Sequence, residues 1–131
     1  MEYALSIEID LPYDEAVPKV KAALAEQGFG ILTEIDVQAT LKEKTGAAME
    51  QYVILGACNP QLAHQALEVE RQIGLLLPCN VVVRAGTGVT IIEALDPKII
   101  AEIPARDGLT PVADEAGRRI RAALDTLRAS A

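Results

Sequence analysis

The sequence is poor in aromatic residues, in histidine and in cysteine. Its 131 residues contain three Tyr, one Phe, no Trp, one His and two Cys. A core built from this chain must therefore be aliphatic, made of Leu, Ile, Val and Ala. Two cysteines do not form the disulfide framework of a small secreted domain. A single histidine leaves a zinc site, which takes three or four ligands, without its usual donors, so we expect no metal or other cofactor.

Positive charge is also scarce, because 12 Lys and Arg stand against 19 Asp and Glu, for a net charge of −7. This balance argues against binding to nucleic acid, where Lys and Arg supply most of the affinity. Four arginines do lie between residues 118 and 128. However, Asp114 and Glu115 precede Arg118 and Arg119 by four residues, which on a helix predicts ion pairs on a solvated face. An anion-binding patch is the alternative interpretation.

Long hydrophobic runs are missing as well. No apolar stretch approaches the ~20 residues that cross a bilayer, and MEYALSIEID at the start has neither the basic nor the apolar region of a signal peptide. We expect a soluble cytoplasmic protein with reduced thiols and no membrane partner. The length predicts one domain over residues 1–131.

Alternating and helical hydrophobic periods follow one another along the chain and define its predicted elements. Strands are expected at 2–10, 30–37, 51–58 and on both sides of a hairpin at 86–88; helices at 14–28, 60–73 and from 110 on; short helices at 38–46 and after 97. The alternation places Ile31, Thr33, Ile35 and Val37 on one face. The order β-α-β-(short α)-β-α-β-β-(short α)-α predicts an α+β domain with a mostly antiparallel sheet.

The middle strands are apolar on both faces. Tyr52 and Ile54 point to one side and Val53 and Leu55 to the other, and residues 81–83 are all Val. Strands of this kind are normally covered on both sides, yet the predicted helices suffice for one face of a five-stranded sheet. An uncovered aliphatic face marks a contact site, so we predict a homodimer through the sheet. The alternative is that some helices close the second face within one chain.

The stretches ILGACNP (54–60) and LLPCN (76–80) each combine Cys-Asn with a proline. Asn59 is a good N-cap and Pro60 a good first helical residue, so Cys58 is expected at a strand end before a helix N-terminus. Such a position lowers a thiol pKa and attracts anions. Cys58 is therefore a candidate for a reactive or ligand-contacting thiol; the alternative is a small buried residue at a tight junction.

The spacing of Cys58 and Cys79 argues against a disulfide or a shared metal, without excluding contact. A helix of about 14 residues carries the chain ~20 Å away, and the five residues Gly74 to Pro78 reach back ~17 Å at most. The second Cys-Asn is better explained by Asn80 as a turn residue before a strand. His64, one turn before Glu68, is expected at the surface, and no Gly-x-Ser-x-Gly, phosphate-binding loop or CxxC is present.

GF at 28–29, YVILGACNPQLA at 52–63, IGLLLPCNVVV at 73–83 and Asp96-Pro97 resemble the family called domain of unknown function 302. The resemblance covers nearly the whole chain. It implies a compact fold similar to that of the TATA-binding protein, with helices on a curved antiparallel sheet. It also fits a dimeric assembly, but it implies no activity. It directs attention to the two Cys-Asn stretches without assigning a role to their residues, which are Cys58, Asn59, Pro60, Pro78, Cys79 and Asn80.

Taken together, these patterns predict a non-enzymatic homodimeric binding module. Its small-ligand site is expected at the Cys58-Asn59-Pro60 helix start, with Cys79 and Asn80 as further candidates. The alternative is a thiol-dependent redox or soft-metal-binding protein that uses Cys58.

Overall fold

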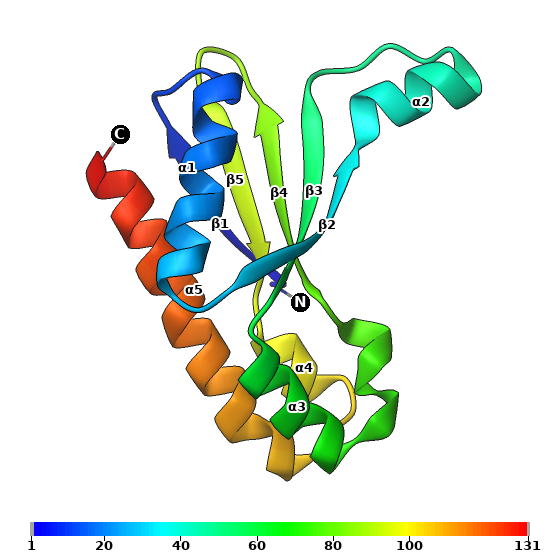
Figure 1. The fold of residues 1–131 in the computed structure, drawn as a ribbon, viewed down its shortest axis with the longest axis vertical. Helices are drawn as coiled ribbons and strands as arrows, with labels where there is room; N and C mark the ends of the chain where they lie inside the picture. The colour runs from blue at the N-terminus through cyan, green and yellow to red at the C-terminus, as the bar shows by residue number, and fades with distance from the viewer. Residues whose placement is uncertain (1, 131) are drawn as a thin grey trace.

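The computed structural model describes residues 2–130 and confirms the predicted order of elements (Figure 1). The strands are β1 (Ala4–Ile9), β2 (Gly30–Asp36), β3 (Tyr52–Cys58), β4 (Cys79–Ala85) and β5 (Thr90–Leu95). The helices are α1 (Tyr13–Glu26), α2 (Val37–Thr45), α3 (Pro60–Val69), α4 (Lys98–Glu102) and α5 (Thr110–Ser130), and two 3₁₀ turns are η1 (Arg71–Leu76) and η2 (Asp107–Leu109).

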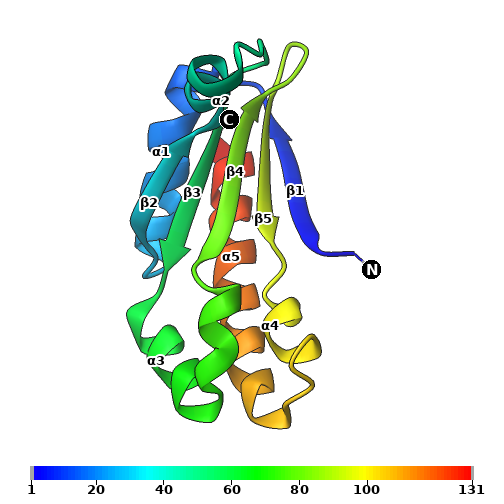
Figure 2. The same cartoon turned by 90° about the vertical axis from the view of Figure 1, so that its right-hand side faces the viewer.

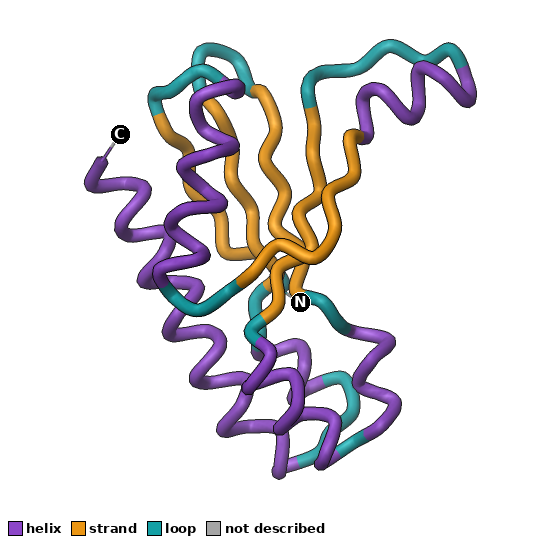
Figure 3. The backbone as a smooth tube through the Cα atoms, in the orientation of Figure 1, coloured by secondary structure: helices purple, strands orange, loops and turns teal. Residues whose placement is uncertain are grey.

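The five strands form one antiparallel sheet in the order β1-β5-β4-β3-β2. Helices α1 and α5 lie side by side on one face of this sheet, as Figures 1 and 2 show. The tube in Figure 3 shows α3, η1 and α4 grouped beyond one end of the strands and α2 beyond the other. Within the part of the chain described here, no helix is both long and apolar enough to cross a membrane.

The main core lies between the sheet and the helices α1 and α5. Alternation along the strands turns Leu55, Val83 and Ile92 toward the helices, where none of the three keeps any exposed surface. Val20 of α1 and Ile120 of α5 pack against them. Burying an aliphatic side chain of this size stabilises the fold by about 1.5–3 kcal/mol, so this aliphatic layer replaces the aromatic residues that the sequence lacks.

A second, smaller core joins the helices beyond the end of the sheet. Its buried members come from α3, η1, the start of β4, α4, η2 and α5, and are Leu62, Ala66, Ile73, Cys79, Ile100, Leu109, Val112 and Ala116. Helix α5 is long enough to contribute to both cores, with Ile120 in the first and Val112 in the second. Helix α5 therefore connects the sheet to the helices that lie beyond its end, α3, η1 and α4.

Helix α1 ends in a Schellman motif at Gly28. The N–H of Gly28 donates to the carbonyl of Ala25 and the N–H of Phe29 to the carbonyl of Leu24. Gly28 adopts a φ of +83°, which side chains other than that of glycine rarely allow. The motif reverses the chain into β2 and buries Phe29 in the main core.

The predicted face of β2 is wrong beyond its first residues. Ile31 pairs with Ala57, but the next pair joins Thr33 to Gly56, so Leu32 is an extra residue in a β-bulge. Since the bulge shifts the alternation by one residue, Ile31 lies on the helix side while Thr33 and Ile35 lie on the opposite side. Strict alternation cannot reveal such an insertion, because it assumes one residue per pair.

Among residues 2–130, no helix lies on the second face of the sheet, as Figure 2 shows from that side. This confirms that the helices cover one face. The larger apolar side chains that keep exposed surface on this face come from β2 to β5, namely Ile35, Tyr52, Ile54, Val82, Ile91 and Leu95. Near its centre the Nε of Arg84 donates to Oε1 of Glu93 at 2.7 Å. We call this surface the open face.

Candidate functional site

A small apolar cavity of about 30 Å³ lies where the two cores meet. The end of β3 and the start of α3 form one wall, and the start of β4 with α4 and α5 forms the other. Its lining is Phe29, Ala57, Cys58, Asn59, Leu62, Ala63, Ala66, Leu77, Pro78, Cys79, Ile100, Val112 and Ala116. A cavity of this volume has room for one or two water-sized molecules or a single ion, and it is too small for a metabolite.

Asn59 fixes the junction between β3 and α3 as predicted. Its Oδ1 accepts a hydrogen bond from the backbone N–H of Leu62 at 3.1 Å, and Pro60 takes the first helical position. Asn59 is itself 7 % exposed. A buried amide at a helix N-terminus therefore borders a cavity that is otherwise apolar.

The structure brings Cys58 and Cys79 to the same end of adjacent strands. Cys79 pairs with Ala57, the residue before Cys58, and both cysteines line the cavity. The expected distance was too large because α3 ends at Val69 and not near Ile73. Glu70 leaves the helical conformation, and the η1 turn brings the chain back to β4.

Both cysteines are free thiols in an environment that favours the protonated form. Burial raises the pKa of the Cys58 thiol above its ordinary value. Burial, with a smaller contribution from the neighbouring Cys58, raises the pKa of Cys79 to about 11. Burial thus opposes the low pKa that the position of Cys58 before a helix N-terminus suggested.

The remaining predicted site residues lie outside the cavity. Pro60 is exposed at the first turn of α3, where it shapes the backbone and does not face the cavity. Asn80 pairs with Gly56 and points to the open face, where it borders a recess of about 340 Å³ with Tyr3 and Tyr52. Both cysteines of the two Cys-Asn stretches thus line the same cavity. Their asparagines lie apart, with Asn59 at the cavity and Asn80 on the open face.

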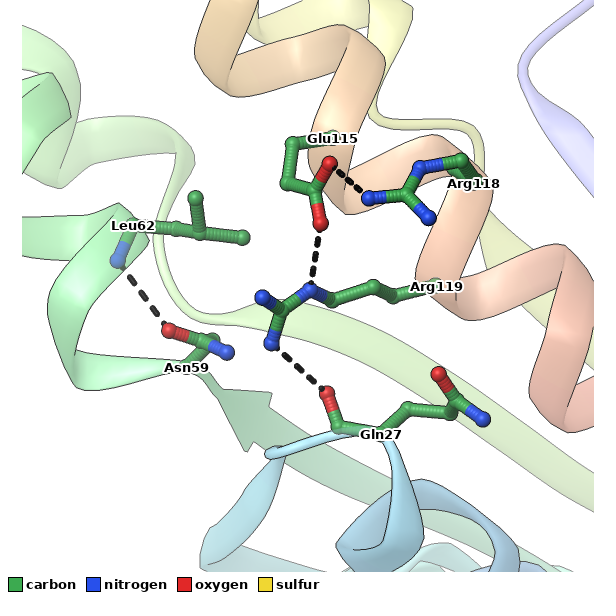
Figure 4. Close-up of polar contacts among 6 residues, drawn as sticks. All are labelled: Gln27, Asn59, Leu62, Glu115, Arg118 and Arg119. Atoms are coloured by element: carbon green, nitrogen blue, oxygen red, sulfur yellow. Dashed lines mark hydrogen bonds and ion pairs between the residues drawn. The ribbon is translucent and has the colours of Figure 1, made fainter.

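Arg119 is a residue that sequence reasoning left on the surface. Its Nε donates to Oε2 of Glu115 at 2.7 Å, which confirms the predicted i,i+4 pair, and its Nη1 donates to the carbonyl of Gln27 at 3.3 Å (Figure 4). A side-chain carbon at Gly28 would lie 3.1 Å from that Nη1 and 2.9 Å from Nδ2 of Asn59. The guanidinium therefore lies close to the Asn59 cap. No local signal connects residues 27–28 with Arg119, since they are about 90 positions apart.

Glu115 accepts hydrogen bonds from both Arg118 and Arg119 (Figure 4). These two bonds, with the positive charges behind them, hold the pKa of Glu115 down to about 2. Arg121 and Arg128 also face carboxylates, those of Asp96 and Asp125, at 3.7 and 3.8 Å. Of the predicted i,i+4 pairs, Glu115–Arg119 is confirmed, whereas Arg118 pairs with Glu115 and not with Asp114. Arg121 pairs outside the helix, with Asp96.

His64 lies at the surface as predicted, with its Nε2 3.2 Å from Oε1 of Glu68. Between residues 2 and 130, no three or more His, Cys, Asp or Glu side chains gather as a metal site would need. Any metal chemistry in this part of the chain would have to use fewer protein ligands.

These features define a class of protein: an α+β fold with helices on one face of an antiparallel sheet and a small cavity, lined in part by two cysteines, at the end of that sheet. The model of the family described as domain of unknown function DUF302 matches residues 5–127, and the chain belongs to this family. A crystal structure of an uncharacterized conserved DUF302 protein from Bacillus stearothermophilus is similar to this chain. It has 28 % sequence identity and a TM-score of 0.91, over 98 % of this chain and 100 % of that one. No protein of curated function matches.

Proposed function

We propose that this protein is a non-enzymatic homodimeric binding module in which a second copy covers the open face. The observation that carries the proposal is the sheet with helices on one side and apolar side chains on the other, including Ile54, Val82 and Ile91. Aliphatic residues at the centre of a sheet are normally shielded from water. A second copy is the commonest partner that supplies such a cover.

The charges on the open face suit a second copy. Arg84 and Glu93 lie on neighbouring strands and form the central ion pair. A twofold axis through this region would place each Arg84 near the Glu93 of the other copy, so that attraction replaces repulsion across the interface. A partner of uniform charge would leave one member of the pair facing a like charge.

The size of the face indicates which elements must join the interface. Five strands at ~4.8 Å spacing and six residues at ~3.3 Å cover roughly 480 Å², whereas a stable interface takes about 800 Å² from each partner. Helix α2 and the η1 turn project past the two ends of the sheet on the open side (Figure 1). Their exposed side chains Leu41 and Leu75 supply apolar surface there.

Substitution at the centre of the open face tests the homodimer. Val82→Asp places a charge amid the apolar side chains, and we expect it to convert the dimer to a monomer in light scattering while the circular dichroism stays that of the folded chain. Ile103→Asp is the matched control, because Ile103 is 57 % exposed at the end of α4, away from the sheet. A Val82→Asp chain with the mass of the natural assembly would refute the proposed interface.

The same proposal includes a small-ligand site at the Cys58-Asn59-Pro60 helix start and places the protein in the reducing cytoplasm. The cavity that Cys58 and Asn59 border supports this site, since it is apolar with one polar amide. Pressurised xenon is a suitable probe because it enters dry apolar cavities. We expect it to shift the amide resonances of Ala57 and Leu62 and to leave those of α2 unchanged; equal shifts across the chain would contradict the site.

The second candidate function is thiol-dependent chemistry, favoured by the convergence of both cysteines on one cavity. Redox chemistry needs a thiolate as the nucleophile, and burial opposes it at both positions.

A further inference from the structure

We propose that the start of α3 binds the carboxylate group of a small organic acid, held between the side-chain amide of Asn59 and the guanidinium of Arg119. The proposal names a ligand class for the small-ligand site and rests on that part of the proposed function. It is independent of the homodimer and of both cysteines.

The side-chain amide of Asn59 uses its oxygen and leaves its nitrogen without an acceptor. Its Oδ1 accepts from the N–H of Leu62, so Nδ2 points the other way, toward Arg119 (Figure 4). Within residues 2–130 this Nδ2 donates no hydrogen bond, although Asn59 is only 7 % exposed. Since no fully buried side-chain nitrogen or oxygen in that range lacks a partner, solvent reaches Nδ2. A buried side chain thus offers an unused donor to a molecule from outside.

Arg119 supplies a second donor beside the first. A side-chain carbon at Gly28 would lie 2.9 Å from Nδ2 of Asn59 and 3.1 Å from Nη1 of Arg119. The two nitrogens are therefore no more than about 6 Å apart, and one ligand oxygen at a hydrogen-bond distance of ~2.9 Å is close enough to contact both. The guanidinium also keeps N–H groups beyond those that contact Glu115 and Gln27.

The N-terminus of α3 adds a third donor and a partial positive charge. The N–H groups of Leu62 and Ala63 already bond to Asn59. The N–H of Gln61 has no such partner in the part of the chain described, and it remains for a ligand. A negatively charged group is therefore stabilised at this helix end.

The charges around the site favour a carboxylate over a phosphate. Glu115 accepts hydrogen bonds from Arg118 and Arg119 and neutralises part of their charge. A ligand with a single negative charge is repelled less by that carboxylate than a phosphate, which carries more than one. The cavity that Asn59 borders is apolar and measures about 30 Å³, so it has room for no more than a short aliphatic chain. Acetate is therefore a suitable probe.

Titration with sodium acetate tests the proposal, with the ionic strength held constant by sodium chloride and the amide resonances of Gly28 and Gln61 followed by NMR. We expect saturable shifts in the natural chain and at least about tenfold weaker binding in Asn59→Asp and in Arg119→Gln. Asn59→Asp is the sharper variant, because it keeps the oxygen that caps α3 and replaces the donor with a second acceptor. Arg128→Gln is the matched control, since Arg128 belongs to another ion pair of α5, and it should bind acetate as the natural chain does. Thermal unfolding shows that each variant is folded.

Shifts that stay linear in acetate concentration, or an Asn59→Asp chain that binds acetate as well as the natural chain, would overturn the proposal. Equal affinity for inorganic phosphate would also overturn it, because the site would then select charge and not a carboxylate.

The xenon measurement separates this failure from that of the proposed function. Xenon shifts at Ala57 and Leu62 without saturable acetate binding would retain the small-ligand site and reject the carboxylate, whereas absence of both would reject the site itself. Light scattering reports on the homodimer independently of either result.

Discussion

Gly56 of β3 lies directly opposite Thr33 of β2 in the strand pairing, and the Thr33 side chain lies on the open side of the sheet. A side-chain carbon at Gly56 would come within 2.1 Å of Oγ1 of Thr33 and within 3.0 Å of Cγ of Pro78. The bulge at Leu32 is what brings Thr33 to this position. Because Pro78 also lines the cavity, this close contact lies at the border of the cavity.

Gly56→Ala should therefore destabilise the protein, because neither the short Thr33 side chain nor the Pro78 ring can move aside freely. We expect a loss of about 1–3 kcal/mol in the free energy of unfolding, as for other overpacked sites, measured by urea denaturation. Gly30→Ala is the control, since a carbon at Gly30 meets no atom within 4 Å. Equal stability of the two variants would show that the contact is not as close as described.

Asn59 predicts a second stability difference, since its side chain caps α3. Asn59→Ala should cost about 0.5–2 kcal/mol because the N–H of Leu62 loses its partner, while Asn59→Asp should keep most of the stability through an equivalent oxygen. Thermal unfolding of the three chains measures both effects. If Asn59→Asp were as unstable as Asn59→Ala, the role of Oδ1 as the cap would be wrong.

Glu115 predicts a dependence of stability on pH. Its pKa is lowered from 4.5 to about 2 in the folded protein, so its ion pairs stabilise the fold above pH ~4.5 and lose that effect as the pH falls toward 2. Glu115→Gln should be less stable than the natural chain at pH 7, and the difference should shrink between those two pH values. The site is at the surface, so the effect is small and salt weakens it. A difference that grows on acidification would have the wrong sign.

The thiols should react slowly with alkylating reagents at neutral pH. Burial raises the pKa of both, to about 11 for Cys79, and the protonated thiol is a poor nucleophile. We expect Cys58 to react faster once the pH rises above the ordinary pKa of a cysteine thiol. We expect Cys79 to react after the protein is unfolded in denaturant. Mass spectrometry of partly modified protein identifies which cysteine has reacted. Rapid modification of folded Cys58 at pH 7 would instead favour the redox alternative.

Local patterns in the sequence were sufficient for most of the fold. The cap at Asn59, the hairpin at 86–88 and the alternation of residues 52–57 each depend on neighbouring residues, and the structure confirms all three. The uncovered face could be predicted because the middle strands are apolar on both faces, while the helices suffice to cover one face of the sheet. These features are local or additive, and hydrophobic periodicity reports them well.

The features that sequence reasoning missed depend on residues far apart in the chain. The bulge at Leu32 depends on how β2 pairs with β3, and the position of Arg119 depends on a carbonyl at Gln27. Whether Cys58 and Cys79 come near each other was left open, because a break at Glu70, without proline or glycine at that position, shortens α3. Tertiary packing decides each of these, and no local motif encodes it.

The central claim is that the open face is covered by a second copy of the chain. The mass of the natural protein in solution, measured by light scattering across a dilution series, tests it most directly. We predict twice the mass of one chain at high concentration, falling toward one chain as the protein is diluted. A mass of one chain at every concentration, with the protein fully folded, would contradict the claim.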